Sequence, residues 1–227
     1  MPRKRRERSP GLVFHAVNRA AKRAVLFESA SDYAAFERLL EEAVDRFQVA
    51  LFAYCIMPTH WHFVLTPNVD GALSRFMHWL ETTHARRWQD AHGLAGLGAV
   101  YQGRFKGIPI ASDHHFLWVC RYVERNPLRA CLVQRAEDWR WSSLRRIDTD
   151  RPKWLADWPV VRPPDWISLV NMPQTDAEVE AFRRAMRTGT PFGDEDWRRR
   201  TEEALGMAPR RPRGRPRRQR LATVLFK

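Results

Sequence analysis

The segment VALFAYCIMPTHWHFVLT, residues 49–66, carries the clearest structural signal in this chain. Two apolar runs flank a Pro-Thr pair, which predicts two antiparallel strands joined by a tight connection. Because side chains alternate along a strand, His60 and His62 emerge on one face, and Trp61 and Phe63 emerge on the other. The sequence therefore predicts a metal-binding pair of histidines on a sheet backed by an apolar core.

The segments on either side of this stretch predict an alternation of strands and helices. The other predicted elements are strands over residues 12–17 and 100–110 and helices over residues 31–47, 72–92 and 113–123. The order βαββαβ is the ferredoxin-like pattern, an antiparallel sheet with two helices on one face. We therefore expect an α+β fold in which the third helix covers the other face. Ser31 or Asp32 should cap the first helix, and a bulge at Gly103 or Gly107 is expected in the last strand.

The net charge of +13 lies mostly at the two ends of the chain. Residues 1–8 carry +4 and residues 209–220 carry +7, which leaves +2 for all the others. Basic arms around a nearly neutral body are typical of proteins that neutralise phosphates, so the expected partner is nucleic acid.

Four parts are predicted along the chain. They are a basic N-terminal arm (1–8), a nuclease domain (9–147), a Pro-rich extension with two short helices near 176–187 and 194–205 (148–208), and an Arg-rich tail (209–227). In the tail, Arg213 and Arg215 flank a glycine between prolines, which resembles an AT-hook that inserts arginines into a narrow minor groove. The alternative for this tail is a solvated end without a partner.

Several classes of protein are not favoured by the sequence. There is no run of 18 apolar residues and no apolar segment after the basic N-terminus, so neither a membrane span nor a secretory signal is expected. The three cysteines have no Cys-x-x-Cys spacing, which argues against a disulfide framework or a zinc knuckle. We expect a cytoplasmic, nucleoid-associated protein, with monomer and dimer left open.

The third predicted helix can complete a site around the histidine pair. Tyr122 and Asn126 are four residues apart and share a helix face, so the asparagine oxygen could join a cation's ligands beside the tyrosine. A metal-bound phosphate could then be attacked by Tyr122. Arg104 and Lys106, alternate residues of the fourth strand, could supply positive charge to a DNA backbone.

Three runs of sequence together carry a family resemblance. They are AYCIMPTHWH (53–62), YQGRFK (101–106) and RYVERNPLRA (121–130) followed by WSS (141–143). In this combination the chain resembles the REP-associated tyrosine transposases, which are IS200-like, single-tyrosine members of the HUH endonuclease superfamily. The resemblance covers residues 9 to 147.

This resemblance implies a fold, an activity and a set of roles. It implies a ferredoxin-like enzyme that uses a divalent metal, Mg²⁺ or Mn²⁺, to cut and transfer single-stranded DNA at a short palindromic hairpin. His60 and His62 would bind the metal, with Asn126 as a third ligand. Tyr122 would form a 5′-phosphotyrosine intermediate in DNA transposition and recombination.

Other readings of the same residues stay open. The fold could serve a DNA-binding regulatory or architectural protein that does not cut, or a phosphodiesterase that uses water as its nucleophile. Asp113, His114 and His115 form a competing metal cluster, although helix capping and packing explain them more simply. His78 and His84 are expected on solvated helix faces.

Overall fold

The computed structural model describes residues 11–96, 98–146 and 151–207. The predicted N-terminal arm and the Arg-rich tail, including Arg213 and Arg215, lie outside the described residues. The domain boundaries expected from the sequence therefore stay predictions.

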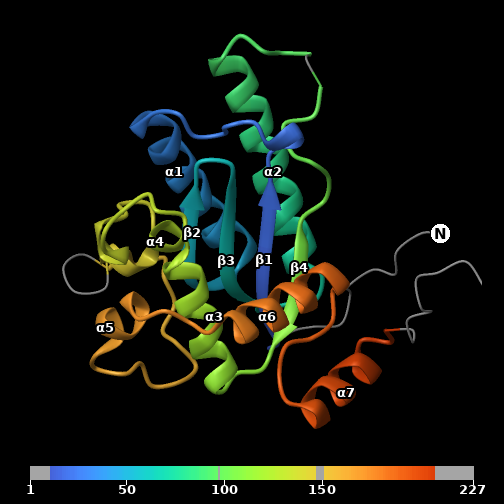
Figure 1. The fold of residues 1–227 in the computed structure, drawn as a ribbon. Helices are drawn as coiled ribbons and strands as arrows, with labels where there is room; N and C mark the ends of the chain where they lie inside the picture. Colours follow the sequence, from blue (N-terminus) through green and yellow to red (C-terminus); the bar gives the residue numbers. More distant parts are fainter. Residues whose placement is uncertain (1–10, 97, 147–150, 208–227) are drawn as a thin grey trace, which may run out of the picture.

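A four-stranded antiparallel sheet forms the centre of the described structure (Figure 1). Its strands are β1 (Val13–Arg19), β2 (Val49–Met57), β3 (His60–Pro67) and β4 (Lys106–Ile110), in the order β2-β3-β1-β4. The helices are α1 (Ala30–Phe47), α2 (Ala72–Ala91), α3 (His114–Glu124), α4 (Asn126–Arg129), α5 (Trp166–Asn171), α6 (Asp176–Thr188) and α7 (Glu195–Ala204), with 3-10 turns at Ala21–Arg23, Ala136–Asp138 and Ser143–Arg146. This is the predicted α+β, ferredoxin-like arrangement with further helices after the last strand.

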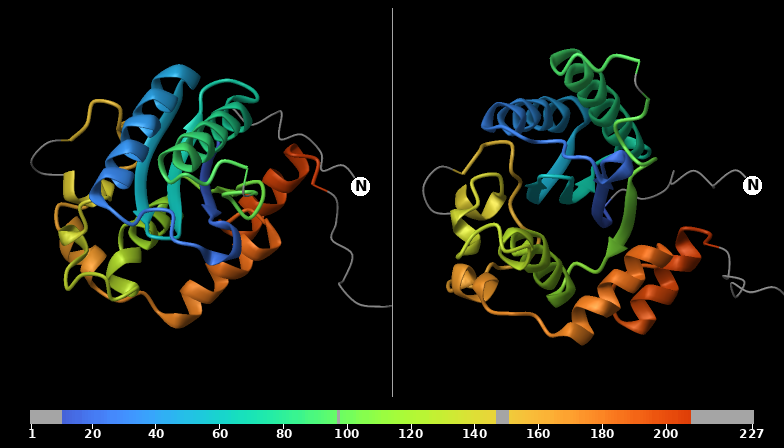
Figure 2. Two further views of the ribbon diagram at one scale, coloured as in Figure 1. Left: turned by 90° about the horizontal axis from the view of Figure 1, so that it is seen from above. Right: turned by 45° about the horizontal axis from the view of Figure 1, so that its top comes forward.

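The sheet lies between two groups of helices (Figure 2), and an apolar cluster fills the space on each of its faces. Helices α1 and α2 cover one face and receive Trp61, Phe63 and Leu65 of β3. Helices α3, α5 and α6 lie over the other face, towards which β3 turns Val64. The alternation along β3 that was predicted from the sequence is therefore confirmed, and it places His60 and His62 on the face that α3 covers.

The N-terminus of α1 lies slightly earlier than predicted. Ser29 is the N-cap, and its side chain accepts a hydrogen bond from the backbone N–H of Asp32. The Asp32 carboxylate in turn accepts from the Ser29 backbone N–H at 2.9 Å, which completes a capping box. The prediction of Ser31 or Asp32 as the cap was wrong because Asp32 fills the third helical position of this motif.

The last strand is shorter than the sequence predicted. Residues 100–105 lie outside β4 and make a single isolated bridge, between Ala20 and Tyr101. The Tyr101 side chain turns instead into the layer of α1 and α2, where its hydroxyl contacts His84 Nδ1 at 2.7 Å. His84 is thus 5% exposed, so its predicted place on a solvated face was wrong, whereas His78 is exposed as expected. The sheet's irregularity lies between Leu51 and Ala53 of β2, not at Gly103 or Gly107.

Segments from the C-terminal half cover both edges of the sheet. Along β2, the backbone N–H of Ile56 donates to the carbonyl of Trp141 at 2.9 Å. Along β4, the N–H of Phe192 donates to the Pro109 carbonyl, and Ala111 donates back to Phe192, both at 2.9 Å. Unpaired strand edges invite aggregation, so these segments protect the sheet as well as extending it.

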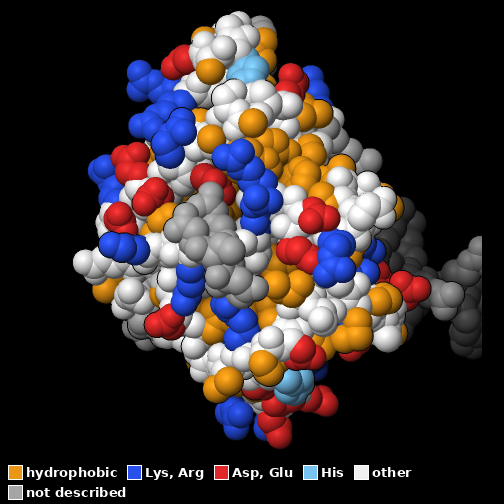
Figure 3. Space-filling view, turned by 90° about the vertical axis from the view of Figure 1, so that its left-hand side faces the viewer, with side chains coloured by type: hydrophobic (Ala, Val, Ile, Leu, Met, Phe, Trp, Pro, Cys, Tyr) orange, Lys and Arg blue, Asp and Glu red, His pale blue; other side chains and the backbone are white. Residues whose placement is uncertain are grey.

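The surface of the described part carries charges of both signs. On the face shown in Figure 3, Lys and Arg side chains alternate with Asp and Glu side chains and with apolar patches. This mixture fits a body whose net charge is close to neutral. Among the described helices, none has the length and apolar character needed to cross a bilayer.

Candidate active site

The two histidines of β3 lie on the sheet face that α3 covers. The ring centroids of His60 and His62 are 5.0 Å apart, and the intervening Trp61 is fully buried on the opposite face. The predicted pairing of these two side chains is thus present in the structure.

Both imidazoles are neutral near pH 7. Burial, together with the positive charges of Arg19 and Arg129, lowers the pKa of His60 to about 4. Burial also holds the pKa of His62 well below its usual value. A neutral imidazole offers a lone pair to a cation, whereas a protonated one cannot.

Each histidine also has one ring nitrogen already engaged. Thr59 Oγ1 lies 3.1 Å from Nδ1 of His60, and Nε2 of His15 lies 2.9 Å from Nδ1 of His62. The Nε2 atoms of His60 and His62 remain for a ligand. In charge state and in donor atoms, the pair fits a divalent cation.

Tyr122 of α3 lies across from this pair and is 7% exposed. Its ring centroid is 6.1 Å from that of His62, 5.7 Å from Trp118 and 4.7 Å from Phe182 of α6. The Cζ atom of Arg129 lies 4.1 Å from the centroid of the same ring. The Tyr122 ring is therefore held by aromatic neighbours, and the Arg129 guanidinium lies against its face.

Asn126 is the residue predicted as a third metal ligand, and it begins α4 just after the tyrosine helix. Its amide nitrogen donates to the backbone carbonyls of Tyr122 at 3.1 Å and Val123 at 3.3 Å. Its side-chain oxygen accepts from Arg129. One lone pair of the amide oxygen is therefore engaged by a positively charged group, and the role of Asn126 as a ligand stays a prediction.

Tyr122 and its helix are held in place by a buried carboxylate. Glu124 is fully buried; it accepts from the Ser143 hydroxyl at 2.6 Å and from Trp166 Nε1 at 2.7 Å. Burial raises the pKa of Glu124, and these two hydrogen bonds oppose that shift. Ser143 of the WSS run also bonds to the Tyr54 backbone, so this run ties the C-terminal end of α3 to β2, while Trp166 ties it to α5.

A cleft of about 940 Å³ opens over these residues. Its walls include both histidines of β3, Tyr122 and Asn126. They also include one carboxylate, that of Glu180, and six basic side chains, which are Arg19, Arg104, Lys106, Arg129, Arg183 and Arg187. Arg104 and Lys106 both line the cleft, although Arg104 precedes β4 instead of lying on it. A concave surface with this excess of positive charge is suited to a phosphate backbone.

Two contributors to this site were not predicted from the sequence. His15 of β1 is 1% exposed and contacts His62, and residues of α6 close one wall of the cleft. A histidine within an otherwise apolar strand was the available signal for His15. Nothing in the periodicity of α6 indicated that it lies against Tyr122.

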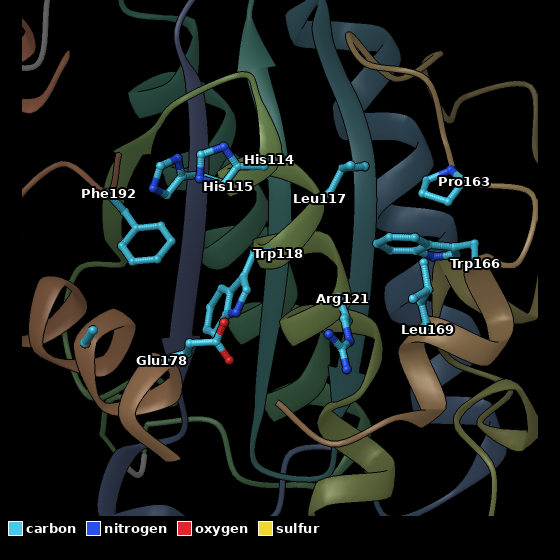
Figure 4. A pocket seen from close by; sticks show the side chains of 11 residues that line it. His114, His115, Leu117, Trp118, Arg121, Pro163, Trp166, Leu169, Glu178 and Phe192 are labelled. Atoms are coloured by element: carbon cyan, nitrogen blue, oxygen red, sulfur yellow. The ribbon is translucent and has the colours of Figure 1, made fainter. Parts of the chain in front are cut away.

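A second pocket, of about 430 Å³, lies on the outer side of α3 (Figure 4). Trp118 and Arg121 project into it from α3, and Glu178 projects from α6. At one end, the ligand atoms of Asp113, His114 and His115 lie within 4.8 Å of one another. The Asp113 carboxylate accepts from the His115 backbone N–H at 2.7 Å, so it caps α3 as predicted. This rival cluster is still close enough to share a cation.

A carboxyl group beside the cleft gives the protein a testable pH dependence. Asn18, which lines the cleft, donates to Glu81 Oε1 at 2.8 Å, and burial raises the pKa of Glu81 from 4.5 to about 7. The folded chain thus keeps this proton up to about pH 7, whereas the unfolded chain loses it near pH 4.5. The stability contributed by Glu81 therefore falls as pH rises through that window.

We expect Glu81→Gln to remove this dependence. Between pH 5 and pH 8 the wild type should lose on the order of 1–2 kcal/mol of unfolding free energy relative to the variant, measured by urea denaturation at each pH. The buried histidines titrate in both proteins and cancel in the difference. A difference that does not change with pH would contradict this assignment.

Taken with its fold, this site marks a DNA-processing protein of the transposase class. A family model described as "Transposase IS200 like" matches residues 9–126, more than half of the chain, and the chain belongs to this family. The matched segment contains His60, His62, Tyr122 and Asn126.

Two solved structures are similar to the chain, and the first of them shares its fold. One, a REP-associated tyrosine transposase bound to a REP hairpin, is 19% identical with a TM-score of 0.53, and the match covers 72% of this chain and 95% of that one. Another, a candidate transposase from Deinococcus radiodurans, is 17% identical with a TM-score of 0.39 and coverages of 55% and 96%. No curated protein sequence is a significant match to the chain.

Proposed function

We propose that this protein cuts and rejoins single-stranded DNA next to a short hairpin, using Tyr122 as its nucleophile. The observation that carries the proposal is the position of a buried tyrosine 6.1 Å, centroid to centroid, from the buried His62, inside a basic cleft. The hairpin is proposed because the REP-associated transposase that shares this fold is bound to one.

The residues divide the chemistry between them. The Tyr122 oxygen attacks the phosphorus, the bond from phosphorus to the 3′ oxygen breaks, and a 5′-phosphotyrosine and a free 3′-hydroxyl result. The proton lost by the phenol is balanced by the one taken up at the 3′ oxygen. Because the phosphotyrosine keeps the ester energy, the reverse attack by a 3′-hydroxyl rejoins a strand without another energy source.

Positive charge and histidines position the substrate. A divalent cation, Mg²⁺ or Mn²⁺, held by His60 and His62 would polarise the scissile phosphate as a Lewis acid. Arg104, Lys106 and Arg183, all on the cleft wall, would hold flanking phosphates. Arg129, packed on the Tyr122 ring, would attract the negative charge that develops as the phenol loses its proton.

A single assay tests the activity. The full-length protein is mixed with end-labelled single-stranded oligonucleotides that carry hairpins from repeats near its gene, with Mn²⁺ or with EDTA. We expect a metal-dependent covalent adduct that survives denaturing electrophoresis. Salt-sensitive binding without any adduct would instead support the non-cutting regulatory protein.

We propose that the Arg-rich tail adds affinity without choosing the cut. Seven arginines lie between residues 209 and 220. If each neutralises one phosphate of single-stranded DNA, replacing all seven with glutamine lowers the slope of log affinity against log salt by about five units, at about 0.7 per contact. Fluorescence anisotropy over a range of salt concentrations measures this slope. An unchanged slope would show that the tail does not contact DNA.

A further inference from the structure

We infer that Met186 of α6 fixes the proton positions of a buried chain of hydrogen bonds, Met186–His15–His62, and thereby keeps Nε2 of His62 open to a cation. This inference rests on the proposed function, because it takes His62 to be a metal ligand. It assigns a positioning role to two residues outside the His-x-His motif.

The geometry of the chain is simple. Nδ1 of His15 lies 3.1 Å from the Sδ atom of Met186, and Nε2 of His15 lies 2.9 Å from Nδ1 of His62. The ring planes of His15 and His62 are inclined by 27° and their centroids are 5.1 Å apart, so the two rings meet through their nitrogen edges. His15 is 1% exposed and His62 6%, so the hydrogen bond between the two rings is buried, and the contact with Met186 is partly buried.

The thioether at one end sets the direction of both hydrogen bonds. A thioether sulfur has no hydrogen and can only accept, so Nδ1 of His15 must carry the proton that points at Met186. His15 is 1% exposed and its described hydrogen bonds reach no carboxylate, so its ring stays neutral. Its Nε2 is then bare and can only accept. Nδ1 of His62 must therefore carry a proton and donate it, and Nε2 of His62 is left with its lone pair.

The opposite arrangement would close the site. If His15 carried its proton on Nε2, Nδ1 of His62 would have to accept, and the proton of His62 would sit on Nε2. That atom could then bind no cation without first losing a proton. Partners of this kind fix the tautomer of a ligating histidine, and their removal costs about 10- to 100-fold in metal affinity.

The surrounding packing keeps His15 from turning away. Its ring meets Phe182 of α6 edge to face at a centroid distance of 5.1 Å and meets Tyr122 at 6.4 Å. Both Phe182 and Met186 belong to α6, which follows the matched family segment. A helix outside that segment thus reaches the metal ligand through one intermediate histidine.

Two measurements on the full-length, metal-free protein test the inference. The protein is labelled with ¹⁵N in its histidine rings, and the tautomers are read from the nitrogen chemical shifts near pH 7.5. We expect protons on Nδ1 of both His15 and His62 in the wild type. In Met186→Leu, which removes the acceptor at similar volume, we expect His15 to populate the Nε2–H form, and we expect Mn²⁺ affinity, measured by electron paramagnetic resonance, to fall about 10-fold.

The matched control is Met77→Leu, the same change at a fully buried methionine on the opposite face of the sheet. It should change neither the tautomers nor the affinity. A wild type with the proton of His15 on Nε2, or a Met186→Leu protein with unchanged tautomers, would overturn the inference. Failure of the proposed function is distinguishable from this, because Mn²⁺ affinity would then be insensitive to loss of His60 or His62 whatever the tautomers are.

Discussion

Replacing Tyr122 with phenylalanine abolishes the covalent adduct with hairpin DNA and reduces cleavage by about 10⁴-fold or more, as removal of a nucleophile does. The change deletes one oxygen from a ring that is packed by Trp118, Phe182 and Arg129. Within the described residues the Tyr122 hydroxyl makes no hydrogen bond, so the variant should fold as the wild type does. Denaturing electrophoresis of the labelled reaction gives the result directly.

The matched control is Tyr101→Phe. It also removes a buried phenol oxygen, but on the face of the sheet covered by α1 and α2, where that oxygen contacts His84. The Tyr101 variant should keep forming the adduct even if its stability falls somewhat. An adduct that persists in Tyr122→Phe would place the nucleophile elsewhere. Cleavage that continues at full rate without an adduct would mean that water attacks the phosphate.

Replacing His60 or His62 with alanine should stop cleavage while leaving DNA bound. Each change removes one of two neutral imidazoles that share a sheet face, so we expect Mn²⁺ binding to disappear and cleavage to fall about 10³-fold. DNA affinity should change by no more than about threefold, because contacts with phosphates dominate it. Electron paramagnetic resonance measures the metal, and anisotropy measures the DNA.

The control for this prediction is His114→Ala. His114 is exposed and belongs to the rival cluster at the start of α3. If that cluster holds the catalytic cation, His114→Ala will lose cleavage and the two β3 variants will keep it. Our assignment requires the reverse pattern.

The central part of the fold could be predicted because its signals are local. Alternation along residues 49–66 placed β2 and β3 correctly, and it put His60 and His62 on the face opposite Trp61. The helical spacing of apolar residues likewise located α1 and α2. These elements follow from the period of their own residues and need no knowledge of distant neighbours.

The errors arose where distant contacts override local pattern. The apolar residues at 100–105 look like a strand, but Tyr101 is drawn across to His84 and the strand begins only at Lys106. For the same reason His84 is buried although its helix position looked solvated. The pattern of apolar residues within α2 cannot predict a contact with the Tyr101 hydroxyl, which lies 17 positions further along the chain.

The candidate site divides in the same way. Tyr122 and Asn126 were placed together by their four-residue spacing, and the structure does hold them on one wall of the cleft. That spacing could not show that Arg129 binds the amide oxygen, nor that His15 and Met186 lie behind His62. These contacts join residues as far as 171 positions apart and depend on the folded chain.

Under the proposed function, the packing of α6 against His15 and Tyr122 decides when during synthesis the chain can first cut DNA. A chain whose synthesis has reached Arg129 already contains His60, His62 and Tyr122, but the helix that carries Phe182 and Met186 does not yet exist. Chains fold from the N-terminus as they are made, and pairings between distant residues form late. We therefore expect a ribosome-bound fragment that ends before α6 to form no covalent adduct with hairpin DNA.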